Sequence, residues 1–430
     1  MLAEVHRTIA HFFPELRQRL DALADGRDRE ACTYPLRALV WAGLLMFLMG
    51  LSARRRLRFE FNSAFGLANL NAVAQTDLET LAHPDTLAYA LQKLPVGELI
   101  RLRRWMVQAL LRGRVLERFR LRGRFYRVAV DGTGYLTFSK PHCPHCLSRR
   151  LSNGQVQYYH PVLEAKLVCD NGLVLSLATE FIVNADGADK QDCELNAFKR
   201  LLPALRASFP HLPLCLLLDG LYLNAPVLTL LRQHHCAWII TFKDGALPQA
   251  AAEFEALAAM TPEHQRTVLD GPTRRSYRWV SDLTHGEHRF HAFECLEVTP
   301  QGDSTRFRWA THLEVTAAVV EELSWKGGRA RWKIENEGFN MQKNGGYALE
   351  HAYAHHWSAA RNFYLLMQIA HLIGQLLLKG ALRHVRLVQT FGSLRAVAGR
   401  LLEAWRTAVL TPEQIASIRA RPCQIRFDDS

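Results

Sequence analysis

The sequence predicts an α/β protein in which a mixed sheet is flanked by helices. Three observations support this class. Both ends of the chain carry long apolar segments with helical spacing. Between about residues 125 and 242, short β-branched and apolar runs alternate with helical segments. Of the 430 residues, 49% are hydrophobic and 22% charged, which excludes a disordered chain.

Residues 1–124 are predicted to form a helical, basic region. Residues 2–23 and 34–58 are long apolar-basic segments, and another helix begins at Asp85 after the break at His83-Pro84. The most apolar run, Ala38–Ala53, has 16 residues, fewer than the roughly 18–20 that span a bilayer. We therefore expect a buried helix there and no membrane partner.

A dense positive stretch closes this region. Between residues 101 and 127, ten arginines stand against one acid, Glu117, with aromatic residues interleaved. The stretch is either a solvated helix face or a surface that neutralises nucleic-acid phosphates. The net charge of +12 makes double-stranded DNA a candidate partner. The candidate DNA-binding arginines here are Arg101, Arg104, Arg112, Arg114, Arg120, Arg122 and Arg124.

Strand patterns follow, separated by turn residues and two helical segments. The expected strands are 125–131, 157–169, 173–183, 214–219 and 236–242. The expected helices are 189–208 and 225–234. Asp170-Asn171-Gly172 supplies the turn before the third strand, so the first three strands form an antiparallel meander. The order β-β-β-α-β-α-β matches a five-stranded RNase H-like mixed sheet.

The domain boundaries follow from these patterns. Residues 125–247 form the first part of the core, and residues 248–319 form a strand-rich insertion that begins with a short helix. A helical segment over 320–353 completes the core. The C-terminal helical region, residues 354–430, contains apolar helices at 357–378 and 394–409 that we expect to pack beneath the sheet.

Two predicted strands end in Asp-Gly, at Asp131-Gly132 and Asp219-Gly220. If these strands are neighbours, both carboxylates emerge at one edge of the sheet. Carboxylate oxygens are the ligands that Mg²⁺ and Mn²⁺ prefer. One Asp-Gly after a strand is more often just a turn, but two at matching strand ends favour a metal site that needs a third acid.

The helical segment 328–347 offers that acid. Arg331 and Glu335 share one face by helical spacing, whereas Glu337 points roughly across the helix. Only one glutamate can face the aspartates, and we choose Glu335. Arg331 can orient its carboxylate or contact a phosphate, and Trp332 can anchor the helix or stack on a base.

Three motifs together resemble the DDE transposases of bacterial insertion sequences, in the group with a Y-R-E-K signature on the third-acid helix. They are D-G-T-G-Y at Asp131–Tyr135, L-L-D-G-L-Y at Leu217–Tyr222 and R-W-K-I-E at Arg331–Glu335. The similarity runs from about residue 125 to residue 353. The family's Tyr falls here on Gly328 and its Lys on Gln342, which is followed by Lys343.

The resemblance implies an RNase H-like catalytic domain with an insertion between the second Asp and the Glu. It implies that Asp131, Asp219 and Glu335 are the catalytic residues and hold two Mg²⁺ or Mn²⁺ ions for phosphoryl transfer. Arg331, Trp332 and Lys343 are then candidate DNA contacts. Cleavage and strand transfer would occur at insertion-sequence ends, with a homodimer pairing two ends.

Two alternatives remain open at this point. One is an RNase H-like nuclease that cleaves DNA but cannot join it. The other is a DNA-binding derivative that keeps the fold and has no activity. Strand-transfer assays on a 3′-hydroxyl end separate the first alternative from a transposase.

The nine cysteines are an odd number, scattered along the chain. Cys169, Cys215 and Cys236 lie in apolar stretches, which favours core positions and a reducing, cytoplasmic setting.

One pair of cysteines has metal-ligand spacing. Cys143 and Cys146 have the spacing of half a structural zinc site, and His160 is a candidate outside ligand. No second Cys-x-x-Cys follows. Without a metal, this loop would order substrate entry next to Asp131.

Overall fold

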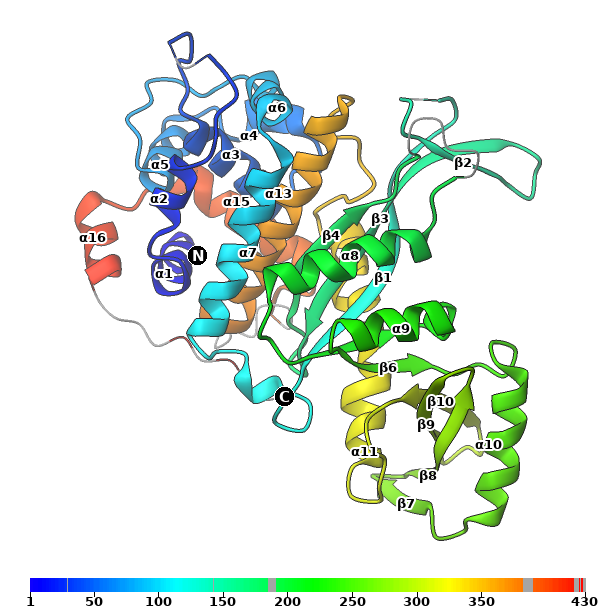
Figure 1. Cartoon of the computed structure of the whole chain (residues 1–430). Coiled ribbons are helices and arrows are strands. Elements are labelled where there is room, and N and C mark those ends of the chain that lie inside the picture. Colours follow the sequence, from blue (N-terminus) through cyan, green and yellow to red (C-terminus); the bar gives the residue numbers. More distant parts are fainter. Residues whose placement is uncertain are drawn as a thin grey trace.

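The computed structural model describes residues 1–28, 30–141, 143–184, 191–381, 390–420, 425 and 427. Over these residues, helices and a large mixed sheet form an α/β protein (Figure 1). The strands are β1 (Tyr126–Phe138), β2 (Leu147–Arg150), β3 (Val156–Val168), β4 (Val174–Phe181), β5 (Leu214–Leu218), β6 (Ala237–Thr241), β7 (Gln265–Asp270), β8 (Thr273–His285), β9 (His288–Val298) and β10 (Ser304–Thr311).

The helices lie on both faces of the sheet and at one end of the molecule (Figure 1). They are α1 (Leu2–Phe12), α2 (Leu16–Asp21), α3 (Leu36–Leu48), α4 (Leu57–Glu60), α5 (Ala64–Ala74), α6 (Pro84–Lys93), α7 (Val96–Arg112), α8 (Glu194–Ser208), α9 (Ala225–Gln233), α10 (Pro248–Met260), α11 (Val320–Glu322), α12 (Asn340–Asn344), α13 (Trp357–Leu376), α15 (Leu394–Thr407) and α16 (Pro412–Ala420).

The sheet has ten strands in the described part of the chain, in the order β2-β3-β1-β5-β6-β10-β9-β8-β7, with β4 also paired to β3. The predicted meander is confirmed, since β1 pairs antiparallel with β3 and β3 with β4. The central strand β5 is also confirmed: all its residues are buried, and it runs parallel to both β1 and β6.

The expected five-stranded sheet is too small. The insertion was expected as a separate strand-rich unit, but its strand β10 pairs antiparallel with β6 and so continues the same sheet. Pairing satisfies the backbone groups that β6 would otherwise expose as an edge strand. The sequence also missed β2, β7 and the part of β1 beyond Asp131.

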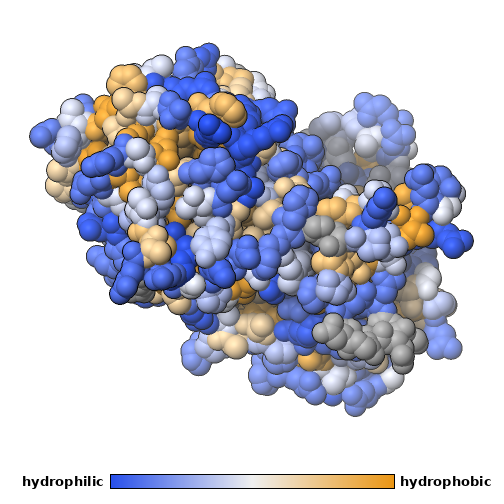
Figure 2. Space-filling view, turned by 90° about the horizontal axis from the view of Figure 1, so that it is seen from above, coloured by the Kyte–Doolittle hydropathy of each residue, from blue (hydrophilic) through white to orange (hydrophobic). Residues whose placement is uncertain are grey.

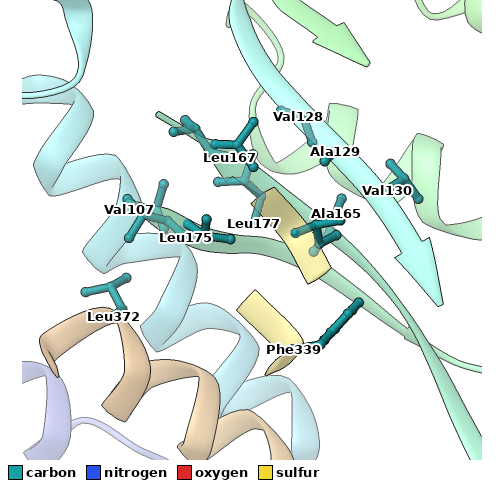
Figure 3. Close-up of a cluster of buried hydrophobic side chains, with 14 of the residues drawn as sticks. Val107, Val128, Ala129, Val130, Ala165, Leu167, Leu175, Leu177, Phe339 and Leu372 are labelled. Carbon is teal, nitrogen blue, oxygen red and sulfur yellow. The ribbon is translucent and has the colours of Figure 1, made fainter. Parts of the chain in front are cut away.

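Apolar packing covers the middle of the sheet on both faces. Helices α7 and α13 pack on β4, and α8 packs on β3 and β4. Figure 3 shows Val107 of α7 and Leu372 of α13 beside Leu175, with Phe339 nearby. This burial explains why the central strands are continuous apolar runs without alternation.

The N- and C-terminal helices pack together. Helix α13 contacts α3, α6 and α7, whereas α15 packs on α5. The Asn69 side chain donates hydrogen bonds to the carbonyls of Trp405 and Ala408, and the Phe61 ring lies 5.1 Å from Trp405. The expectation that both C-terminal helices lie beneath the sheet is therefore wrong for α15, because its apolar face meets the N-terminal helices instead.

In the described part of the chain, the helical segment Trp357–Gly380 is long and apolar enough to cross a membrane, but most of it is buried inside the protein. The Ala38–Ala53 run forms the buried helix α3, as predicted, and ends where Gly50 takes a positive φ of 63°. Both segments are core helices in this fold. Figure 2 shows hydrophilic side chains over most of the upper face, with apolar ones gathered toward the helical end.

Candidate functional site

Asp131 lies within β1 and Asp219 directly follows β5, at the level where the parallel pairing of these two strands ends. The expectation that a strand ends at Asp131 is wrong, because β1 continues to Phe138 through its pairing with β3. Ala129 of β1 is the register partner of Leu217 of β5, so the same register extended by two residues aligns the two aspartates. Strand β5 stops at Leu218, and the Asp219 side chain accepts a hydrogen bond from the Leu221 backbone N–H at 2.9 Å. Neighbouring strands are about 4.8 Å apart. The carboxylates therefore share one edge of the sheet.

A further acid at this edge, Glu194, was missed by the sequence analysis. It lies in the first turn of α8, and the Tyr222 hydroxyl donates a hydrogen bond of 2.6 Å to its Oε1. A Cβ at Gly132 would come within 2.9 Å of Glu194 Oε2, so this glycine leaves room for the carboxylate. The sequence signal that could have found Glu194 is its place in the first turn of α8. Helix α8 precedes the central strand β5, so its first turn lies near the carboxyl end of that strand.

The start of α8 also differs from the sequence prediction. A helix was expected from residue 189, but it begins at Glu194 with Cys193 as its N-cap. Residues 189 and 190 lie outside the described residues. The later start is what puts Glu194, rather than an earlier acid, into the first turn.

The segment that carries Glu335 is helical but irregular. It passes from α11 through a π-helical turn (Leu323–Gly327), a 3₁₀ turn (Gly328–Trp332) and a second π-helical turn (Ile334–Phe339) into α12. The expected helix is therefore present with irregular hydrogen bonding. π-Helical turns are frequent at functional sites.

The two glutamates of this segment face different partners. Glu335 lies close enough to Asp131 to raise the pKa of that carboxyl group. Glu337 instead lies 3.6 Å from Lys333 Nζ. Its charge also raises the pKa of Lys379, against the larger lowering by burial. Of the two glutamates, Glu335 is thus the one in electrostatic contact with Asp131.

Burial, together with neighbouring charges, shifts the pKa values of two acids at this edge. Burial, then repulsion from Asp219 and Glu335, raises the pKa of Asp131, opposed by Arg331 and the Gly132 N–H. Arg331 Nη1 donates to Asp131 Oδ2 at 3.3 Å. Burial together with Asp131 and Asp219 likewise raises the pKa of Glu194. Several carboxylates with one arginine among them favour binding of a cation.

The carboxylates form an open cluster. Metal-ligand atoms of His, Cys, Asp and Glu come together in threes at one place among the residues that the structure describes. There, atoms of Cys143, Cys146 and His160 lie within 4.8 Å of one another. The acids at the sheet edge are more widely spread. Their arrangement is therefore not a preformed cage for one ion.

A basic cleft of about 450 Å³ adjoins Asp219. Its wall combines cations with aromatic rings from β10 and the 3₁₀ turn. The cationic side chains are Lys243, Arg306, Arg308, Arg329 and Arg331, and the aromatic ones are Phe242, Phe307, Trp309 and Trp332. Trp332 is 50% exposed, and the Arg331 guanidinium lies 4.8 Å from its ring centroid. The sequence analysis missed Lys243 and the cations at 306, 308 and 329.

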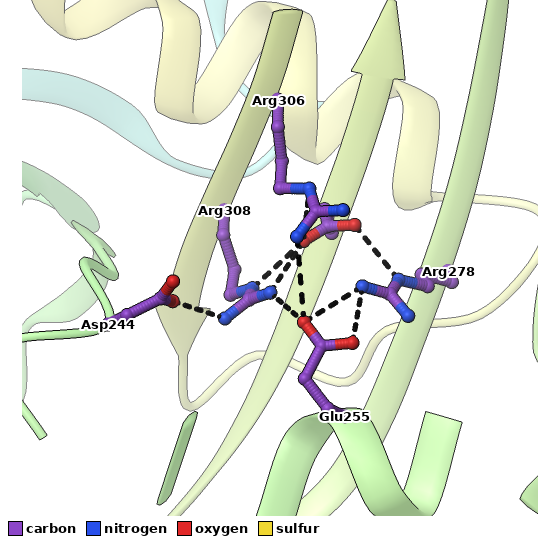
Figure 4. A network of polar contacts seen from close by, with 6 residues as sticks. Asp244, Glu255, Arg278, Arg306 and Arg308 are labelled. Atoms are coloured by element: carbon purple, nitrogen blue, oxygen red, sulfur yellow. Dashed lines mark hydrogen bonds and ion pairs between the residues drawn. The ribbon is translucent and has the colours of Figure 1, made fainter. Parts of the chain in front are cut away.

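An ion-pair network holds one wall of this cleft (Figure 4). Buried Arg308 bonds Asp244 at 2.7 Å and Glu294 at 2.8 Å, and it also bonds Glu255. Arg278 bonds Glu294 at 2.9 Å. Arg306 remains 55% exposed at the rim. Arg306 also pairs with Glu255 and Glu294, at 3.7 and 3.6 Å, so the network fixes β8, β9 and β10 against α10 and keeps an exposed guanidinium at its rim.

The arginine-rich stretch divides into two groups. Arg103 and Arg127 are buried and structural, because Arg103 Nη1 donates to Ser176 Oγ at 2.8 Å and Arg127 Nη1 to Asp170 Oδ1 at 2.6 Å. The expectation that all ten arginines form one surface is therefore wrong for these two. Of the candidate DNA contacts, Arg104 and Arg120 are half-buried and the other five are exposed, namely Arg101, Arg112, Arg114, Arg122 and Arg124.

This arginine-rich stretch does not lead directly to the carboxylates. Its last loop precedes Tyr126, the first residue of β1, whereas Asp131 lies five residues further along the strand. At about 3.3 Å per residue, this separation is roughly 16 Å. The loop is therefore separated from Asp131 by the first part of β1, and the cleft supplies the cations nearest the acids.

The two departures from the Y-R-E-K signature have structural reasons. A Cβ at Gly328 would lie 2.2 Å from the Trp309 ring, so no larger side chain fits there. Gln342 is buried, and its Nε2 donates to Gln368 Oε1 at 2.8 Å. Lys343, the next residue, lies 4.0 Å from Glu335 Oε1. The cation beside the third acid is thus Lys343.

No protein-family model matches the chain, and no curated protein matches it either.

Proposed function

We propose that the chain is a DDE-type transposase that cleaves and joins double-stranded DNA by metal-dependent phosphoryl transfer. One observation carries the proposal: Asp131 and Asp219 are register neighbours on parallel strands, with Glu335 within electrostatic range. The strand order β4-β3-β1-β5-β6, with β3 antiparallel to its neighbours, supports an RNase H-like core. Fold alone does not define function, so the site carries the weight.

The donor set fits divalent magnesium or manganese. Asp131, Asp219, Glu335 and Glu194 offer only hard oxygen ligands, which suit these ions. Burial, and after it repulsion between the carboxylates, raises the pKa values of Asp131 and Glu194, and a bound cation would offset both effects. When bound, such ions activate a water or a 3′-hydroxyl and stabilise the leaving oxygen.

The neighbouring cations act on the substrate. Arg331 holds the Asp131 carboxylate in place through its hydrogen bond. Arg306 and Lys343, both partly exposed, bind phosphates on either side of the reacting one. Trp332 stacks on an adjacent base, because its ring is half-exposed and faces the cleft.

The test is a paired cleavage and strand-transfer assay. The probes are a supercoiled plasmid carrying the gene with its genomic flanks and a labelled flank duplex with a free 3′-hydroxyl, each incubated with the full chain and Mg²⁺ or Mn²⁺. A transposase cuts at the flanks and joins the labelled end to a target plasmid.

The same assay separates the alternatives. Cleavage without joining at any metal concentration would identify a nuclease instead. DNA binding with neither reaction would identify an inactive derivative. Neither result is compatible with the proposal.

A further inference from the structure

The connection between β1 and β2 carries a compact cluster of soft metal ligands. Cys143 Sγ and Cys146 Sγ each lie 3.3 Å from His160 Nε2, and the two sulfurs are 3.9 Å apart. His160 comes from β3, so the cluster joins residues 14 and 17 positions apart in sequence. A disulfide would need a sulfur separation of about 2.05 Å. These are two separate thiols that converge on one imidazole.

The distances match the edges of a zinc tetrahedron. Zinc binds sulfur at about 2.3 Å and imidazole nitrogen at about 2.0–2.1 Å, which at tetrahedral angles puts ligands roughly 3.5–3.8 Å apart. The observed separations of 3.3 and 3.9 Å bracket this range. Thiolate and imidazole ligands select zinc over magnesium. The cluster is therefore of a different chemical kind from the carboxylate edge.

The surroundings hold these ligands in place. The His160 ring packs against Trp357 of α13 at 4.8 Å, and His145 packs on the same tryptophan at 5.3 Å. The backbone N–H groups of His145 and Cys146 bond the Cys143 sulfur. His145 Nδ1 is buried and has no hydrogen-bond partner. His145 is not among the three residues whose ligand atoms converge, so a water would complete the fourth coordination position.

The cluster of Cys143, Cys146 and His160 is remote from the carboxylates. Leu136, the partner of His160 across the β1–β3 ladder, is five residues from Asp131, or roughly 16 Å. A metal held here cannot also contact Asp131.

Hydrogen bonds connect the cluster to the segment that leads to Glu194. The Cys146 carbonyl accepts from Asn184 Nδ2 at 3.1 Å, and Ser148 exchanges two hydrogen bonds with Gln191 at 2.6 and 3.0 Å. Gln191 is three residues before Glu194, the first residue of α8. An ordered β1–β2 connection therefore restrains the approach to this acid.

We propose that Cys143, Cys146 and His160 bind a structural zinc ion, which fastens the β1–β2 connection to β3 and to the start of α13. Zinc coordination replaces the two thiol protons, which pass to solvent. The ion takes no part in phosphoryl transfer. Its role is to hold the cysteines of the connection in place, and with them the hydrogen bonds to Asn184 and Gln191.

The direct test is metal content. The full chain is loaded with zinc, dialysed against metal-free buffer and analysed by elemental mass spectrometry. The proposal predicts about one zinc per chain, lost in Cys143→Ser, Cys146→Ser and His160→Asn and retained in Cys193→Ser, whose cysteine is exposed and outside the cluster. Asp131→Asn should also retain zinc, which separates this site from the proposed catalytic one.

Cobalt substitution covers the case in which a variant fails to fold. The wild-type chain loaded with Co²⁺ should show thiolate-to-cobalt charge transfer and the intense visible bands of tetrahedral cobalt, and one equivalent of Zn²⁺ should remove them. A wild-type chain that retains no zinc and gives only octahedral cobalt bands would overturn the proposal, as would full zinc retention in the folded Cys143→Ser and Cys146→Ser variants.

Discussion

At the residue scale, the acids at the sheet edge are distinguished by their neighbours. Asp131 receives a hydrogen bond from Arg331 and is raised in pKa by burial, Asp219 and Glu335. Glu337, only two residues from Glu335, is turned toward Lys333 and Lys379. The two glutamates therefore form a matched pair for mutagenesis, because they share a helix and differ in what they face.

Neutralising the triad should abolish catalysis and spare binding. Asp131→Asn, Asp219→Asn and Glu335→Gln each remove a charge that a divalent ion needs, so we expect cleavage to fall by at least about a thousandfold. DNA affinity, measured by fluorescence anisotropy, should stay within about threefold of wild type. Glu337→Gln is the control and should keep near-normal cleavage. Full activity in any triad variant would remove that residue from the site.

Glu194 makes a separate prediction. Glu194→Gln keeps the shape of the side chain and its hydrogen bond from Tyr222, but it removes one negative charge from the edge. We expect the Mg²⁺ concentration for half-maximal cleavage to rise about tenfold or more, as measured in a metal titration at fixed DNA. Asp192→Asn, two residues away and paired with Arg200, should leave that concentration unchanged. Equal titration curves for both variants would assign Glu194 a structural role only.

The lowered pKa of His6 leads us to expect that the free energy of unfolding falls at acidic pH. Burial, with repulsion from Arg419, lowers its pKa to about 4, against about 6.5 in an unfolded chain. The contribution to stability is complete above pH 6.5 and is lost toward pH 4, because only the unfolded chain takes up the proton. The loss is at most about 3 kcal/mol.

Chemical unfolding at several pH values measures this effect. In His6→Gln, the fall in the free energy of unfolding between pH 6.5 and 4 should be shallower than in wild type. An identical slope in the variant would mean that other groups dominate acid destabilisation.

At the scale of elements, buried polar contacts hold the Glu335 segment against the sheet. Lys166 of β3 is buried and donates to Gln342 and Gln368 at 3.3 and 3.0 Å. Its ammonium also lies 4.7 Å from the Phe339 ring centroid. Burial lowers the pKa of Lys166 to about 8. The third acid is thus positioned by contacts from β3 and α13, which lie far from it in the chain.

Helix α7 is likewise held against the sheet by a buried polar contact, made by Arg103. It lies 4.0 Å from the buried carboxylate of Glu164 and bonds Ser176 of β4. Removing it in Arg103→Met leaves that carboxylate without its cation, so we expect the free energy of unfolding to fall by about 3–5 kcal/mol. Arg104→Met, at the next and half-buried position, should cost less than about 1 kcal/mol.

Urea denaturation of the two arginine variants gives the comparison. Both substitutions remove one positive charge from α7, so net charge cannot explain a difference between them. Similar stabilities would show that the Arg103–Glu164 pair is dispensable to the fold.

At the scale of the whole molecule, one continuous sheet brings the insertion to the carboxylate edge. Because β10 pairs with β6, it sets Arg306 and Arg308 beside the cleft at Asp219. The arginine loop lies before Tyr126, the first residue of β1, five residues ahead of Asp131. The protein therefore presents two basic surfaces at different distances from the proposed chemistry.

These surfaces should behave differently on DNA. We define the cleft set as Lys243, Arg306 and Arg329, and the loop set as Arg112, Arg114, Arg122 and Arg124. Alanine substitution of either set should flatten the plot of log affinity against log salt by up to about 0.9 per lost phosphate contact. Only the cleft set should also slow cleavage at saturating DNA, since it lies beside the acids.

Affinity measured across a range of salt concentrations, together with single-turnover cleavage, tests this division. An unchanged slope of log affinity against log salt in the loop variant would show that these arginines are a solvated surface and do not contact DNA phosphates. Equal loss of cleavage in both variants would contradict the separation of the two surfaces.

The sequence by itself determined the class of the fold and the central strands, because unbroken apolar runs and turn residues are local patterns. It also placed Asp219-Gly220 correctly at the end of a strand, but the strand that it ended at Asp131 continues to Phe138. Only the tertiary structure decided the rest. The β6–β10 pairing, the burial of Arg103 and Arg127, and the position of Glu194 beside Asp131 all depend on contacts between distant segments. No local pattern encodes which edge or face a distant side chain will meet.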